Sequence, residues 1–174
     1  MGGLSDRGQG EGGVARHVFF VDRSLGRYDV PAALREAGES VEMHDAHFPS
    51  GTTDPEWLRL VGERKWVVLT KDYRIKHRPL QREAIRSGGI RQFTFVSGQV
   101  RGVDMAAAFV RALPAMKRLL DTHAGPFIAK VFKDGRVAMW ERLGAPRARA
   151  PGPAAPSRPI HGPLPLRPCA PPPS

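Results

Sequence analysis

Short apolar runs alternate with amphipathic stretches through the middle of the chain. The runs are too short for helices and end at polar turns, so they predict buried strands. The stretches between them carry apolar residues at helical spacing, and several begin at a proline or end at a glycine, as helices do. The predicted strands cover residues 17–22, 40–45, 66–70 and 90–98, and the predicted helices cover residues 30–38, 54–65, 79–89 and 103–123.

Two further apolar runs follow the last of these helices. FIAKVF and RVAMWE flank Asp134-Gly135, the residue pair most typical of a two-residue hairpin turn. Strand and helix therefore alternate four times before a C-terminal β-hairpin. This order predicts an α/β fold of three layers, with a mostly parallel central sheet and helices on both faces.

The two ends of the chain differ in composition from this middle region. Residues 1–16 include six glycines and show no hydrophobic periodicity, which predicts a flexible leader. Residues 145–174 hold eleven of the 17 prolines, mixed with Ala, Arg and Gly, which predicts a disordered tail with extended segments. We therefore expect one domain over residues 17–144.

The net charge and the cysteine content indicate the class of partner and the cellular compartment. The chain has 27 Lys and Arg against 17 Asp and Glu, a net charge of +10 that favours polyanionic partners. The single cysteine, Cys169, excludes an internal disulfide and a cysteine-based metal site, so a cytoplasmic location is expected. There is no apolar run long enough to cross a membrane, and the N-terminus lacks the apolar stretch of a signal peptide.

Three aspartates fall where an open α/β sheet binds its ligands, beyond the carboxyl ends of the strands. Asp22 follows the first predicted strand, Asp72 follows the third, and Asp54 opens the helix that leads into the third. Converging carboxylates suit Mg²⁺, which would neutralise a phosphodiester and lower the pKa of an attacking water. Asp45, at the end of the second strand, is a lesser candidate for the same site.

Each of these acids has a structural alternative. Asp54 precedes a proline and could cap its helix. Asp72 could initiate a turn, and Asp22 could pair with Arg23 or Arg27. Only the joint placement of the three acids favours a metal site.

A basic segment follows Asp72 directly. Cationic side chains beside a metal site would hold an RNA backbone, although an exposed basic helix end is the plain alternative. The candidate RNA-binding residues are Lys71, Arg74, Lys76, Arg78 and Arg82.

Other chemistries have weaker support. His44 and His47 lie close enough for a zinc reading, but no second pair of ligands recurs, and loop histidines are more often hydrogen-bonded or exposed. The chain has no GxxxxGK[ST] phosphate-binding loop, so we expect no nucleotide cofactor. It also lacks the GxSxG of serine hydrolases.

The segments FFVDRSLG, HDAHFPSGTTDPEWL, WVVLTKDYRIKHRP and PFIAKVFKDGRV, in this order, resemble the PIN-like domain of the VapC-type family of toxin-like ribonucleases. The resemblance spans His17 to Trp140. It implies a three-layer PIN-like fold and a Mg²⁺- or Mn²⁺-dependent endoribonuclease, with Asp22, Asp54 and Asp72 in the matching positions. It also implies an antitoxin protein that blocks the site, and a homodimer.

The sequence departs from that family in one place. Arg74 stands where many PIN domains carry a second acid two residues after the strand-end aspartate, and Asp45 or Glu56 could compensate. Our leading hypothesis is a metal-dependent endoribonuclease. The alternative is a PIN-like module that binds nucleic acid or protein without cutting it.

Overall fold

The computed structural model describes residues 17–74 and 78–144. The predicted leader, the predicted tail and the candidate Lys76 lie outside the described residues. The predicted limits of the domain therefore stay a prediction.

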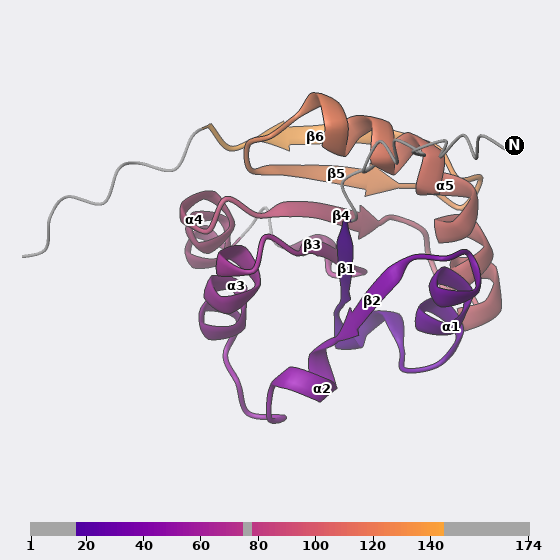
Figure 1. Cartoon of the computed structure of the whole chain (residues 1–174), viewed down its shortest axis with the longest axis horizontal. Coiled ribbons are helices and arrows are strands. Elements are labelled where there is room, and N and C mark those ends of the chain that lie inside the picture. Colours follow the sequence, from indigo (N-terminus) through magenta and orange to yellow (C-terminus); the bar gives the residue numbers. More distant parts are fainter. Residues whose placement is uncertain (1–16, 75–77, 145–174) are drawn as a thin grey trace, which may run out of the picture.

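A six-stranded sheet forms the centre of the molecule, with the strand order β2-β1-β3-β4-β5-β6 (Figure 1). The first five strands run parallel, and β6 runs antiparallel to β5 at one edge. This arrangement confirms the predicted mostly parallel sheet with a C-terminal hairpin. The strands are β1 (Val18–Val21), β2 (Ser40–Met43), β3 (Val67–Thr70), β4 (Arg91–Phe95), β5 (Phe127–Val131) and β6 (Val137–Arg142).

Helices cover both faces of the sheet and complete the three predicted layers (Figure 1). α1 and α5 pack together on one face, and α3 and α4 contact each other on the other face. Two short elements, η1 and α2, follow the carboxyl ends of β1 and β2. The helices are η1 (Arg23–Leu25), α1 (Asp29–Glu36), α2 (His44–His47), α3 (Asp54–Glu63), α4 (Pro79–Ser87) and α5 (Gly102–Thr122).

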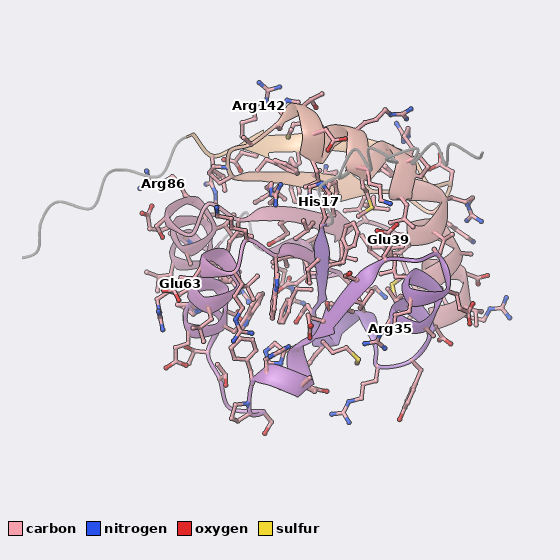
Figure 2. All side chains as sticks on the ribbon, in the orientation of Figure 1. His17, Arg35, Glu39, Glu63, Arg86 and Arg142 are labelled. Atoms are coloured by element: carbon pink, nitrogen blue, oxygen red, sulfur yellow. The ribbon has the colours of Figure 1, made fainter. Side chains whose placement is uncertain are left out.

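Two hydrophobic cores lie between these layers, because alternate residues of a strand point to opposite faces of the sheet. Phe19 packs into the core beneath α1 and α5, whereas Phe20 packs beneath α3 and α4, and both are fully buried. The outer sides of α3 and α4 are charged, as the labelled Glu63 and Arg86 show (Figure 2). The apolar faces of these helices are thereby directed toward the sheet.

Two local predictions are wrong. The second strand ends at Met43, and His44 and Asp45 belong to the short helix α2. The hairpin turn has three residues, because Phe132 N donates to Arg136 O at 2.9 Å while Gly135 N donates to Phe132 O at 2.9 Å. Gly135 has φ +86°, the left-handed conformation that closes such three-residue turns and favours glycine.

The connections between the first three strands set a reversal of strand order within the sheet. The chain leaves β1, forms β2 on one side of it, and then crosses to form β3 on its other side. Strand order therefore reverses between β1 and β3, the position where open α/β sheets bind ligands. Within residues 17–74 and 78–144, no helix combines the length and apolarity that crossing a membrane requires.

Candidate active site

Asp22 and Asp72 lie at the carboxyl ends of the two strands that flank this reversal point. Val21 of β1 pairs with Leu69 of β3, and Asp22 N continues the ladder by donating to Leu69 O at 3.0 Å. Asp72 follows two residues after Thr70, the last residue of β3. The two aspartates therefore come from adjacent strands, as their positions in the sequence predicted.

The Thr70 hydroxyl links these two acids. It donates to Asp22 Oδ2 at 2.8 Å, and it accepts a hydrogen bond from Asp72 N at 3.1 Å. Ser24 Oγ also donates to Asp22 Oδ2, at 2.6 Å, and accepts from Lys71 N at 2.9 Å. Because Thr70 is only 3 % exposed, its hydroxyl is fixed by the surrounding core. The loops after β1 and β3 are thus joined by side-chain hydrogen bonds at the acids themselves.

Asp54 reaches the same edge from the first turn of α3. Its Oδ1 accepts from Trp57 Nε1 at 3.1 Å, and its Oδ2 accepts from Gln81 Nε2 of α4. Arg78 connects it to the strand ends, because one guanidinium nitrogen lies 3.7 Å from Asp54 Oδ2 and 3.4 Å from Asp72 Oδ2. Asp22, Asp72 and Asp54 therefore belong to one polar network.

The two lesser acid candidates have other partners. Asp45 Oδ2 lies 2.8 Å from Arg27 Nε, and its Oδ1 lies 4.0 Å from Arg23 Nε. Glu56 accepts from both the backbone N and the hydroxyl of Thr53, each at 2.9 Å, which lowers the pKa of this carboxyl. These bonds form a capping box at the start of α3.

The cap of α3 differs from the sequence interpretation. Thr53 is the N-cap residue, and Asp54 is the first residue of the helix. The structural alternative that made Asp54 the cap is therefore wrong. The spacing Thr53-x-x-Glu56 is the sequence signal of a capping box and could have identified the true cap.

The carboxylate oxygens at this edge supply only part of the set of ligands that a hard cation such as Mg²⁺ takes. Among the described residues, no three His, Cys, Asp or Glu side chains gather closely enough to hold one ion. Asp22 and Asp72 still offer carboxylates on either side of Thr70, and Mg²⁺ often uses one or two protein carboxylates together with water and phosphate oxygens. Because Asp54 is turned toward Trp57 and Gln81, the acids left as candidate ligands at the strand ends are Asp22 and Asp72.

The two histidines of the zinc interpretation have separate surroundings. His47 Nε2 lies 2.7 Å from Glu42 Oε2, whereas His44 is 1 % exposed and packs against Phe20, Phe48 and Trp57. Burial, and secondarily the charge of Arg23, lowers the pKa of His44. Neither imidazole belongs to a group of three metal-binding side chains within the part of the chain that the structure describes.

The basic candidates that the structure describes fall into two groups. Lys71 and Arg74 flank Asp72 in the loop after β3, where Arg74 is exposed. Arg78 contacts the acids, as described above, whereas Arg82 pairs with Glu141 and so ties α4 to β6. Positive charge therefore lies next to Asp72 on both sides along the chain.

The family model for the PIN like domain matches residues 17–97, a range that contains every candidate acid of the site. A protein of Mycobacterium tuberculosis described as "Putative ribonuclease VapC45" is 30% identical over 117 residues, which cover 65% of this chain and 84% of that protein. The chain belongs to the PIN-like, VapC-type family. The resemblance drawn from the four sequence segments is thereby confirmed. No solved structure matches the chain.

Sequence reasoning missed several residues of this PIN-like domain that organise its acidic edge. Thr70 and Ser24 were not among the candidate site residues. A hydroxyl residue at a strand end beside a candidate acid is a usable signal, because it can bond that acid. Gln81 contacts Asp54 across 27 residues, and no spacing in the sequence indicates this pair.

Proposed function

We propose that this chain is a metal-dependent endoribonuclease that cleaves RNA at the carboxyl edge of β1 and β3. The observation that carries the proposal is the link between Asp22 and Asp72 through the Thr70 hydroxyl at the reversal point of the sheet. Membership of the PIN-like, VapC-type family supports a nuclease, and the relative from Mycobacterium tuberculosis carries ribonuclease in its name.

Each acid has a proposed role. Asp22 and Asp72 would hold Mg²⁺ or Mn²⁺, and Asp54 would complete the acidic edge beside Arg78. When bound, the ion supplies charge neutralisation at the phosphodiester and a more acidic attacking water. The protein itself positions the carboxylates, since Thr70 and Ser24 fix Asp22 while Trp57 and Gln81 fix Asp54.

The basic residues would hold the RNA backbone. Lys71 and Arg74 lie beside Asp72 in sequence. One guanidinium nitrogen of Arg78 contacts both Asp54 and Asp72, so a phosphate oxygen can replace one of these carboxylates as its partner. The other two members of the proposed set are Lys76, which lies outside the described residues, and Arg82, which is paired with Glu141.

The family also suggests partners and a compartment for this chain. We propose RNA as the substrate and an antitoxin protein as the inhibitor of the site, with a homodimer as the assembly. We place the protein in the cytoplasm, where its RNA substrates would be available. These assignments rest on family membership.

A second candidate function is RNA binding without cleavage. It is favoured by the position of Arg78, which lies within ion-pair distance of both Asp54 and Asp72, and by the absence of three clustered acids among the described residues. Such a module would bind RNA with an affinity that falls steeply with salt, and it would leave the RNA intact with every divalent ion.

Cleavage of labelled RNA separates these two functions. Wild-type protein should cut RNA with Mg²⁺ or Mn²⁺ and should stop when EDTA is added. Asp22→Asn and Asp72→Asn should each lower the rate by about 100-fold or more, because each removes a charge that holds the ion. The matched control is Asp121→Asn, which changes an exposed aspartate near the end of α5, at the opposite edge of the sheet. Equal cleavage by wild type and both site variants would exclude the proposed centre.

A further inference from the structure

The exposed apolar side chains of this domain gather at one edge. Among the described residues, Tyr28, Tyr73, Leu80 and Val103 are the large hydrophobic side chains that are exposed, at 80, 58, 79 and 54 %. Tyr28 lies between β1 and α1, and Tyr73 lies in the loop after β3. Leu80 and Val103 lie in the first turns of α4 and α5, the helices that follow β3 and β4. All four therefore follow the carboxyl ends of parallel strands, on the side of the acids. Apolar surface concentrated at one edge indicates binding there.

Tyr73 lies in a turn that is closed by a hydrogen bond between Asp72 and Arg74. Asp72 Oδ1 accepts from Arg74 N at 2.9 Å, so Tyr73 is the middle residue of an Asx turn. The backbone before it is fixed as well, since Asp72 N donates to the Thr70 hydroxyl and Lys71 N donates to Ser24 Oγ. The backbone next to Tyr73 is thus held by hydrogen bonds, and its exposed ring follows an acid of the proposed centre directly in sequence.

Tyr28 lies in the connection between β1 and α1, six residues after Asp22. It immediately precedes α1, and its carbonyl accepts a hydrogen bond from Ala32 N at 3.0 Å. The preceding residue, Arg27, is anchored to Asp45 at 2.8 Å. Tyr28 is therefore an exposed ring next to a fixed cation, as Tyr73 is next to Arg74. Within residues 17–74 and 78–144, neither tyrosine ring contacts another ring.

Exposed aromatic rings alternating with cations match the chemistry of a single-stranded nucleic acid. Its bases offer flat faces that stack on aromatic side chains, and its phosphates pair with Lys and Arg. A duplex does not offer those faces, because its bases are already stacked and paired. The cations within two residues of the tyrosines in sequence are Arg27, Lys71 and Arg74.

We propose that Tyr73 and Tyr28 are specificity-determining residues that stack on bases of single-stranded RNA on the two sides of the acidic edge. This inference rests on the proposed function for the identity of the ligand, and it adds two residues of this chain that contact the RNA bases. Tyr73, next to Asp72, takes the base nearest the proposed cleavage point. Tyr28 takes a base on the β1 side.

The test measures RNA binding without cleavage, by fluorescence anisotropy of a short labelled oligoribonucleotide in EDTA. Tyr73→Ala and Tyr28→Ala should each weaken binding about 5- to 150-fold, the range found for loss of one base stack. Tyr73→Phe keeps the ring and should bind within about twofold of wild type. Leu80→Ala is the matched control, because it removes an equally exposed apolar side chain that has no aromatic face.

Two changes in the ligand make the test specific for stacking. An oligonucleotide with abasic sites in place of its bases should bind wild type and Tyr73→Ala equally, since only phosphate contacts remain. A fully paired RNA duplex should likewise show no penalty for either tyrosine variant. The salt dependence of binding should be the same for wild type and Tyr73→Ala, because stacking releases no counterions, whereas Lys71→Ala should lower it.

The outcomes separate this inference from the nuclease proposal. Unchanged RNA affinity in both tyrosine variants overturns the stacking roles, and so does a loss in Leu80→Ala as large as that in Tyr73→Ala. If the tyrosine variants lose affinity but wild type never cuts RNA, stacking stands and the nuclease proposal fails. If wild type cuts RNA and Asp72→Asn does not, while both tyrosine variants bind normally, the nuclease stands and stacking fails.

Discussion

Removing the Thr70 hydroxyl tests the internal organisation of the site. Thr70→Val keeps the shape of the side chain but removes the donor to Asp22 and the acceptor of Asp72 N. Loss of a hydrogen bond to a charged group costs about 1.5–3 kcal/mol, and the half-exposed N–H adds about 1 kcal/mol. The extra buried methyl group returns about 0.8 kcal/mol. We therefore expect the free energy of unfolding to fall by about 2–3 kcal/mol.

The matched control for this variant lies directly opposite on the next strand. Thr94 of β4 pairs with Thr70 in the sheet register and is also buried, but its hydroxyl accepts from Gln92 Nε2 and contacts no acid. Thr94→Val should lower the free energy of unfolding by about 1 kcal/mol. Urea unfolding followed by circular dichroism gives both values.

RNA cleavage then separates a structural role of Thr70 from a positioning role. Thr70→Val should lower the rate about 10- to 100-fold, as loss of a residue that orients metal-binding side chains does. Thr94→Val should cleave at the wild-type rate under conditions in which both proteins are folded. The reasoning is refuted if Thr70→Val cleaves as fast as Thr94→Val, or if the two variants unfold at the same urea concentration.

Two of three further predictions concern stability, and the third concerns the pKa of Glu56. Gly62→Ala should destabilise the fold by about 1–3 kcal/mol in urea unfolding, because the new Cβ would lie 2.5 Å from Gly88 O; a gain in stability contradicts this. The free energy of unfolding should fall as the pH drops below 6.5. The pKa of buried His44 is lowered in the folded state, so the unfolded chain binds the proton first. His44→Leu should therefore flatten this pH dependence. The pKa of the Glu56 carboxyl should lie below its ordinary value of 4.5 by NMR, and Thr53→Ala should raise it only part of the way back, because the backbone N–H of residue 53 still donates to Glu56.

The fold was largely predictable because its signals are local. A run such as HVFFVD is apolar on both faces, and the structure buries Phe19 and Phe20 in separate cores. The end of β2 was misplaced because His44 is a polar residue buried among aromatic rings, which a hydrophobic pattern does not reveal. The hairpin turn was predicted to have two residues because Asp134-Gly135 is typical of two-residue turns. The same pair also suits a three-residue turn, in which Gly135 takes the left-handed position.

The site was predictable only as far as sheet topology determines it. Asp22 and Asp72 could be placed together because both follow parallel strands, and such strands share a carboxyl edge. The contacts of Asp54 could not be predicted, since they depend on how α4 packs against α3. Gln81 and Arg78 reach Asp54 only through that packing.

The central claim is that the acids at the ends of β1 and β3 bind a divalent ion. Titration of Mn²⁺ into isotope-labelled protein tests it most directly, because the paramagnetic ion broadens the NMR signals of nearby amides. We predict that the signals of Asp22, Thr70 and Asp72 broaden first, and that Asp22→Asn abolishes this selectivity while Asp121→Asn retains it. Broadening that begins elsewhere in the domain, or that is the same in Asp22→Asn, would contradict the account.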